Sequence, residues 1–277
     1  MTTQRIDTRF AALKAQGRAA FVAYVVAGDP DLEASFEILS GLPQAGADLI
    51  ELGVPFSDPM AEGPPIQRAS QRALKAGMTL EGVLDMVRRF RLADQTTPLI
   101  LMGYLNPLLT HGLDRFAADA AHAGVDGLIV VDCPPEEAGP LADALDANQL
   151  SLIRLATPTS DDDRLAVVVR RTSGFVYYVS VAGVTGVKEA SAAAVAPAVA
   201  RVRRASGLPV AVGFGIRTPQ RAAEVARVAD AAVVGSALVD ELAAALERGE
   251  PVAPKVLETA RALAQAVHQA RVTQASD

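Results

Sequence analysis

The chain has 277 residues, of which 50% are hydrophobic and 21% are charged, which provides a substantial core and excludes intrinsic disorder. Its formal charge is -6 and its basic residues are scattered, so we expect no nucleic acid partner. A single cysteine permits no internal disulfide, and the sequence has neither a signal-peptide pattern nor an apolar run of the roughly 20 residues that span a bilayer. We therefore expect a cytoplasmic protein with no membrane partner.

Short runs of apolar and β-branched residues recur along the chain and are typical of buried strands. The eight runs are 20–26, 49–53, 98–103, 127–132, 150–156, 174–180, 208–213 and 231–235. Alanine-rich stretches with a helical period lie between them at 31–45, 79–93, 113–123, 135–147 and 162–171. This alternation predicts parallel strands joined by helical crossovers.

Eight such units within roughly 250 residues fit a closed (β/α)8 barrel better than an open sheet. The predicted fold is an α/β TIM barrel, with extra helices before the first strand at 6–16 and after the last unit at 252–272. No linker rich in Gly, Ser and Pro divides the chain, so we expect one domain over residues 1–277. Prolines next to capping or acidic residues at 29–31, 134–137 and 218–219 predict three helix starts.

An acidic residue lies within the second apolar run, which is unusual because burying an ionised carboxylate costs several kcal/mol. Strand alternation places Ile50 and Leu52 on one side and Glu51 on the other, so helices that cover the sheet would leave Glu51 pointing into the barrel. Apolar surroundings would raise its pKa from about 4.3 toward neutrality, where a carboxyl can both give and take a proton. The alternative is a structural glutamate that is hydrogen-bonded to its neighbours.

Glu62 follows in a loop whose paths are restricted by prolines, and Asp58 lies in the same loop. From spacing alone, either residue could simply be solvated.

At the other end of the chain, glycines close the last two predicted strands at 212–216 and 234–237. These glycines predict a phosphate site, because they let backbone N–H groups approach an anion, a helix begins at Ser236, and the 183–186 segment offers further donors. The alternative is that the glycines only form tight turns.

The segments ELGVPFSDP at 51–59 and GPPIQ at 63–67 closely resemble the tryptophan synthase α subunit family. Further segments match at 101–107, 124–127, 131–137, 183–186, 213–216 and 235–236. The resemblance implies a barrel that cleaves indole-3-glycerol phosphate to indole and glyceraldehyde 3-phosphate in a retro-aldol reaction, without a cofactor of its own. It also implies a β subunit partner in an α2β2 heterotetramer, where the β subunit holds pyridoxal phosphate and joins indole to serine.

The same resemblance assigns roles to the two glutamates. Glu51 matches the essential acid/base, which takes a proton from the glycerol hydroxyl and can deliver one to indole C3. Glu62 stands where the family usually has an aspartate that binds the indole N–H. Its extra methylene changes the geometry but keeps the charge, and a negative charge near the ring nitrogen stabilises the cation that forms on protonation of C3.

Other matched residues line the predicted site. Tyr24, Tyr104 and Tyr177 match substrate-pocket positions, where Tyr24 replaces a frequent phenylalanine, and their alternative role is core packing. The residues that match the phosphate cradle are Gly186, Gly213, Gly215, Gly235 and Ser236. Thr185 matches a loop threonine that engages the second-strand loop near Asp58 and Glu62 when the site closes.

No metal is expected, because His111, His122 and His268 have no ligand spacing and are predicted to be surface residues, while Cys133 is predicted to be a small apolar filler. Two other functions stay open from the sequence. One is a different phosphate-binding barrel enzyme, either an isomerase or a synthase of the same pathway, although such a synthase would need a lysine acid and no predicted strand carries a lysine. The other is a non-catalytic regulator that only activates the β partner, which would bind the loops at 55–64 and 183–186.

Overall fold

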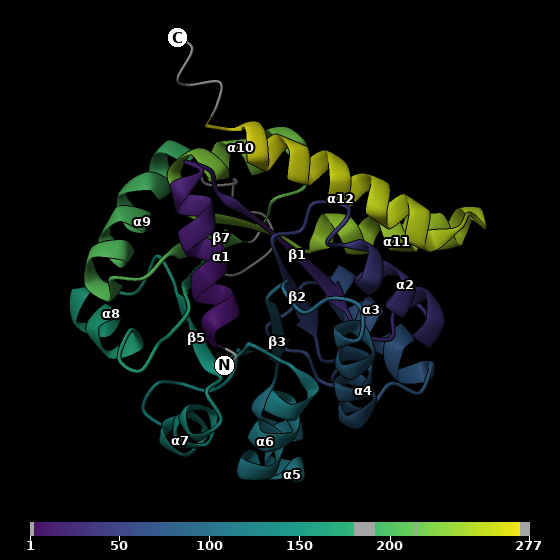
Figure 1. The fold of residues 1–277 in the computed structure, drawn as a ribbon, viewed down its shortest axis with the longest axis horizontal. Coiled ribbons are helices and arrows are strands. Elements are labelled where there is room, and N and C mark those ends of the chain that lie inside the picture. The colour runs from purple at the N-terminus through teal and green to yellow at the C-terminus, as the bar shows by residue number, and fades with distance from the viewer. Residues whose placement is uncertain (1–2, 180–191, 214, 272–277) are drawn as a thin grey trace.

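Eight parallel strands close into a barrel in chain order, with β8 paired back to β1, so the predicted fold is confirmed (Figure 1). The computed structural model describes residues 3–179, 192–213 and 215–271. The strands are β1 Ala20–Val26, β2 Leu49–Gly53, β3 Leu99–Gly103, β4 Gly127–Val130, β5 Ser151–Ala156, β6 Val176–Val179, β7 Val210–Gly213 and β8 Ala231–Val234.

Helices surround the barrel and bury its outer face. They are α1 Thr3–Ala15, α2 Leu32–Gly41, α3 Pro64–Lys75, α4 Leu80–Arg91, α5 Leu105–His111, α6 Leu113–Ala123, α7 Gly139–Ala147, α8 Asp162–Val168, α9 Ala192–Ser206, α10 Pro219–Val228, α11 Ser236–Arg248 and α12 Val252–Gln269. None of these described helices is both long and apolar enough to span a bilayer.

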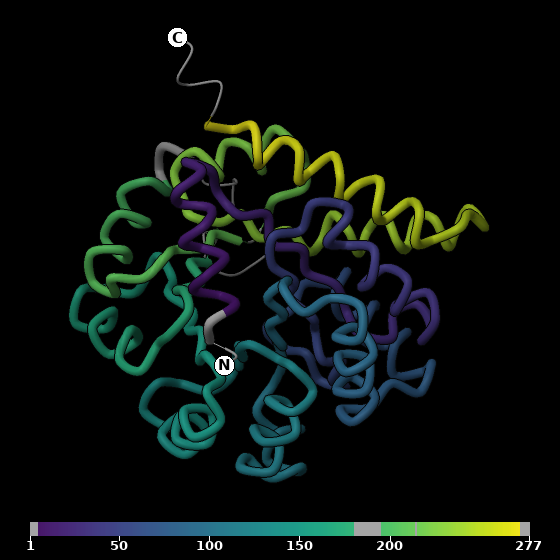
Figure 2. Tube along the Cα trace, in the orientation of Figure 1, coloured from purple at the N-terminus to yellow at the C-terminus, as the bar shows by residue number. Residues whose placement is uncertain are grey.

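The extra helices predicted at the two ends of the sequence are α1 and α12. α1 covers the N-terminal end of the barrel, where the Phe10 ring lies 5.7 Å from the Phe175 ring and Arg5 pairs with Asp126 at 2.7 Å. In the trace of Figure 2, α1 crosses the middle of the view in purple and α12 runs above it in yellow. α12 packs against α2, α10, α11 and β1, within the outer layer of helices.

Two of the three predicted helix starts are confirmed. Asp31 caps α2 by accepting hydrogen bonds from two backbone N–H groups of its first turn, although Pro30 precedes the cap and does not occupy the first helical position. Thr218 caps α10, with Pro219 at the first helical position.

The helix start predicted at 134–137 is wrong, because α7 begins only at Gly139. The intervening segment forms a turn in which the Glu137 N–H donates to the Pro134 carbonyl at 3.1 Å. Glu136 pairs with Arg164 on α8 and caps no helix. Two successive prolines also keep the residues before them out of helical conformation.

Three aspartates fix the strands at the N-terminal end of the barrel. Asp48, Asp126 and Asp230 each precede an even-numbered strand, and each carboxylate accepts a backbone N–H from the preceding strand. The donors are Phe21 at 2.9 Å, Leu99 at 2.8 Å and Val210 at 2.8 Å. Arginines pair with each carboxylate, at 2.7 to 2.9 Å for Arg18, Arg91 and Arg203. Charge and backbone hydrogen bonds together therefore set the stagger of neighbouring strands far from the mouth of the barrel.

We predict that Asp126→Asn lowers the free energy of unfolding by about 3 kcal/mol, because it leaves the Arg91 guanidinium, whose side chain is 7% exposed, without its counter-charge. Urea denaturation measures the change. The matched control is Asp85→Asn, which breaks an exposed pair with Arg88 and should change stability by less than about 0.5 kcal/mol. Equal losses in the two variants would contradict the assigned role of Asp126.

Candidate active site

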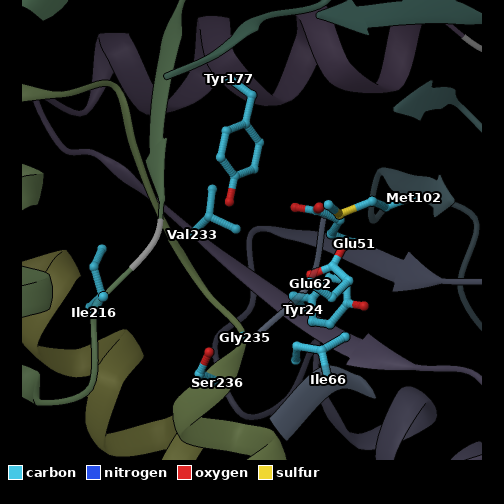
Figure 3. A pocket seen from close by; sticks show the side chains of 11 residues that line it. Tyr24, Glu51, Glu62, Ile66, Met102, Tyr177, Ile216, Val233, Gly235 and Ser236 are labelled. Atoms are coloured by element: carbon cyan, nitrogen blue, oxygen red, sulfur yellow. The ribbon is translucent and has the colours of Figure 1, made fainter. Parts of the chain in front are cut away.

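A pocket opens at the C-terminal end of the barrel, among the strand tips and the loops after β2, β7 and β8. It encloses about 440 Å³ of empty space, part of which is open to solvent. Its lining residues are Tyr24, Glu51, Glu62, Ile66, Met102, Tyr177, Gly215, Ile216, Val233, Gly235 and Ser236. Figure 3 shows the two glutamates and Tyr24 gathered on one side, with Tyr177 reaching in from the other.

Glu51 points into the barrel, as strand alternation predicts. It pairs in register with Tyr24 on β1 and Ile100 on β3, and only 1% of its surface is exposed. Neither carboxyl oxygen has a hydrogen-bond partner within the described part of the chain, so the alternative of a structural, hydrogen-bonded glutamate is not supported there. Burial, and secondly the negative charge of Glu62, raise the pKa of Glu51 to about 8.

Glu62 lines the same pocket from the loop between β2 and α3. It is half-buried, and burial raises its pKa to about 7, so it is not a freely solvated loop residue. Asp58, by contrast, is exposed and accepts a hydrogen bond from the Ser57 hydroxyl at 2.6 Å. The structure thus brings Glu62 to Glu51 and leaves Asp58 outside the pocket lining.

The three predicted pocket tyrosines do not share one role. Tyr24 and Tyr177 line the pocket, and burial raises the pKa of each well above its usual value, with both carboxylates adding to the effect. Both are therefore neutral phenols in the working pH range. Tyr104 is buried but is not among the lining residues, and its hydroxyl accepts the Ala61 N–H at 2.9 Å in the loop that carries Glu62.

Several glycines at the strand tips make room for these tyrosines. A Cβ at Gly213 would lie 2.0 Å from the Tyr177 hydroxyl, and one at Gly53 would lie 2.4 Å from the Tyr24 hydroxyl. A Cβ at Gly235 would also approach the Tyr24 ring at 2.8 Å. Part of the glycine pattern read from the sequence as a phosphate signal therefore has a second cause, which is the close approach of an aromatic ring to the backbone.

The predicted phosphate cradle is described only in part. Gly215, Gly235 and Ser236 line the pocket, and α11 begins at Ser236 as predicted, with its N-terminal N–H groups at the pocket edge. Gly213 is outside the lining, and Thr185 and Gly186 lie outside the described residues. A helix N-terminus next to flexible-backbone glycines is a favourable place for an anion.

Sequence reasoning missed the apolar walls of the pocket, which are Ile66, Met102, Ile216 and Val233. Side-chain alternation along the strands could have predicted that two of them, Met102 and Val233, point into the barrel. Met102 lies two positions beyond Ile100, the register partner of Glu51, and Val233 pairs with Val22, two positions before Tyr24. The side chains of Ile66 and Ile216 come from a helix and a loop, whose placement strand parity does not predict.

The prediction of surface histidines is wrong for His111, whose side chain is 6% exposed and contacts Asp119 at 2.9 Å and Glu81 at 3.4 Å. His268 is partly buried against Asp48 at 2.9 Å. Both are held by carboxylates contributed from other turns or elements, which residue spacing does not reveal. His122 is exposed and Cys133 is buried, as predicted. Among the described residues no cluster of three or more His, Cys, Asp or Glu side chains could hold a metal ion.

Comparisons with known proteins give one consistent result. Residues 10–268 match the family described as tryptophan synthase alpha chain. The chain is 73% identical over 271 residues to the tryptophan synthase alpha chain of Phenylobacterium zucineum, covering 98% of both, and 71% identical over 272 residues to that of Caulobacter vibrioides, covering 98% and 99%. The crystal structure of subunit alpha from Legionella pneumophila superposes with a TM-score of 0.88 at 40% identity, covering 95% of this chain and 98% of that chain.

The buried carboxyl makes a prediction about stability. With a folded-state pKa of about 8 against an ordinary 4.5, Glu51 binds a proton in the folded chain that the unfolded chain releases, so its contribution to stability is full below about pH 4.5 and is lost as pH rises to 8. We predict that Glu51→Gln removes this loss and is more stable than the parent at about pH 9, by up to roughly 5 kcal/mol. Urea denaturation across this pH range measures it, with the exposed Glu258→Gln as control. Parallel curves for parent and Glu51→Gln would contradict the burial argument.

Proposed function

The chain belongs to the tryptophan synthase alpha chain family, whose members cleave indole-3-glycerol phosphate to indole and glyceraldehyde 3-phosphate, and from this premise we propose that Glu51 and Glu62 divide the chemistry between them. The observation that carries the proposal is the pair itself: a fully buried carboxyl without a hydrogen-bond partner among the described residues, beside a half-buried one in an apolar pocket. Burial in a pocket that raises the pKa of a carboxyl toward neutrality is typical of groups that act as acids and bases in catalysis.

In the proposed mechanism Glu51 handles both protons. With a pKa of about 8 it begins mostly protonated at neutral pH and can deliver its proton to indole C3. The resulting carboxylate then takes the proton of the glycerol hydroxyl next to the ring. The electron pair of that O–H bond forms the aldehyde C=O, and the carbon–carbon bond to C3 breaks as its electrons return to the ring. Glu51 ends protonated again, so the cycle is balanced.

Glu62 has the electrostatic role. When C3 is protonated, positive charge develops on the indole nitrogen, and a carboxylate near that nitrogen stabilises the cation. Glu62 is half-buried whereas Glu51 is fully buried, so ionisation costs less at Glu62, which favours the state with Glu62 ionised and Glu51 protonated. The charge of Glu62 also contributes to keeping Glu51 protonated.

The other matched residues would bind substrate. We assign the indole ring to the apolar walls and to Tyr24 and Tyr177, which line the pocket. We assign the phosphate to backbone N–H groups and one hydroxyl. The residues of this cradle are Gly186, Gly213, Gly215, Gly235 and Ser236. Thr185 would meet the Asp58 loop and exclude water from the closed site.

The family's alpha chain needs no cofactor of its own and works with a beta subunit. We propose an α2β2 heterotetramer with pyridoxal phosphate on the β subunit and a cytoplasmic location. The surface we assign to the partner is the 55–64 loop, where Met60 is 84% exposed and Phe56 is half-buried, together with the 183–186 loop. Apolar side chains of that size gain from being covered.

We predict that Glu51→Gln lowers kcat for indole release by about 10³-fold, because the amide can neither donate nor accept the transferred proton. Stimulation of the partner β subunit should persist, since the variant keeps the shape of the pocket. Steady-state assays of purified protein, with and without the β subunit, measure both quantities, and the exposed Glu258→Gln serves as control. Indole release at the parent rate by Glu51→Gln would overturn the assignment.

We also predict that Glu62→Gln lowers kcat by about 10²-fold while Glu62→Asp loses less than about tenfold, because the aspartate keeps the charge that stabilises the ring cation. The same assay of indole release measures the two variants side by side. Equal losses of kcat in the two variants would mean that the length of the Glu62 side chain, and not its charge, determines its contribution.

A further inference from the structure

A backbone hydrogen bond and a ring contact connect the loop that carries Glu62 to the end of β3. The Val54 N–H donates to the Met102 carbonyl at 2.8 Å, which keeps the start of the loop beside the end of β3. Two residues after Met102, the Tyr104 ring stacks on the Phe56 ring with centroids 5.2 Å apart and planes at 29°. Tyr104 is 4% exposed, and this loop contributes two of its contacts, the Phe56 ring and the Ala61 N–H.

Hydrogen bonds hold the backbone on both sides of Glu62. The peptide N–H of Ala61 donates to the Tyr104 hydroxyl at 2.9 Å, and the Glu62 N–H donates to the Pro59 carbonyl at 3.1 Å. On the other side, the Gln67 side-chain amide donates to the Glu62 carbonyl at 2.9 Å. Gln67 itself lies in the first turn of α3 and is fixed by its own helix.

Because these contacts hold the backbone on both sides of Glu62, its carboxylate can move mainly by rotation about the side-chain bonds. A glutamate has one more rotatable bond than an aspartate, and on an unanchored loop its carboxylate would sample solvent as well as the pocket. Neither Tyr104 nor Gln67 is among the residues that line the pocket. Any contribution they make to the chemistry is therefore indirect, and the residue they flank is Glu62.

We propose that Tyr104 and Gln67 are positioning residues, which hold the peptide groups flanking Glu62 so that its carboxylate stays in the pocket beside Glu51. The inference depends on the role proposed above for Glu62. It assigns Tyr104 a function different from direct substrate binding. It also gives the GPPIQ segment at 63–67 a physical reason for its glutamine.

The test uses Tyr104→Phe, which keeps the ring and its stacking on Phe56 but removes the acceptor for the Ala61 N–H. We expect kcat for indole release to fall about tenfold with KM changed less than about twofold, because a misplaced carboxylate weakens the transition state more than the bound substrate. The matched control is Tyr178→Phe, which removes an equally buried hydroxyl from the outward face of β6 and should leave kcat within about twofold of the parent.

The decisive comparison is the same substitution in a Glu62→Gln background. If Tyr104 acts through the Glu62 charge, the double variant is no slower than Glu62→Gln alone, whereas equal losses in both backgrounds would overturn the inference. A loss for Tyr104→Phe no larger than for Tyr178→Phe would overturn it as well. Gln67→Met tests the second anchor by the same criteria, including the Glu62→Gln background, and decides the question if Tyr104→Phe does not fold. Full activity of Glu62→Gln would instead overturn the proposed role of Glu62 itself.

Discussion

An uncompensated carboxyl inside an apolar barrel is the constraint on which the site depends. Removing an ionised glutamate from water costs several kcal/mol, and none of the described residues supplies Glu51 with a cation or a hydrogen-bond donor. The group therefore retains its proton up to about pH 8 and becomes an acid that can also act as a base. The same burial that supports the proposed chemistry of Glu51 lowers the stability of the folded chain above neutral pH.

The ion pairs that stabilise the fold and the candidate catalytic residues lie at opposite ends of the barrel. At the N-terminal end, Asp48, Asp126 and Asp230 are each paired with arginine and with a backbone N–H of the neighbouring strand. At the opposite end, Glu51 has no such partner in the described part of the chain. Strands fixed firmly at one end can present an unfavourable group at the other without losing register, and this arrangement is typical of barrel enzymes, whose reactive residues lie at the C-terminal face.

The geometry around Glu62 connects loop structure to the proposed mechanism. In that mechanism Glu62 provides charge, and the hydrogen bonds of Tyr104 and Gln67 hold the peptide groups around it. A loop held only at its two ends would place a carboxylate loosely, and anchoring through backbone groups limits that freedom without adding a polar side chain to the pocket. The apolar walls then raise the pKa of Glu62 and strengthen its interaction with a developing positive charge.

Much of the fold could be predicted because strand and helix periods are local properties of a sequence. The eight strands follow from short apolar runs, the inward direction of Glu51 from the two-residue alternation of a strand, and the capping Asp31 from helix-start chemistry. The positions of loop residues depend on contacts between distant segments. For this reason the sequence left Glu62 open to a solvated reading, placed a helix start too early at 134–137, and took His111 for a surface residue.

Glycines illustrate the same limit. Gly213 belongs to a motif that resembles a phosphate cradle, yet in the structure a Cβ at this position would lie 2.0 Å from the Tyr177 hydroxyl. A glycine in a sequence motif indicates that the position has no room for a side chain, but it does not show whether a ligand or another residue occupies that space.

The protonation state of Glu51 is the most direct test of these conclusions. Infrared difference titration, recorded as the parent minus Glu51→Gln, follows the C=O band of this one protonated carboxyl as pH is raised. We predict that the band is lost with a midpoint near pH 8. Loss of the band near the ordinary glutamate value of 4.5 would show that Glu51 is ionised at neutral pH, and the proposed acid role would then be wrong.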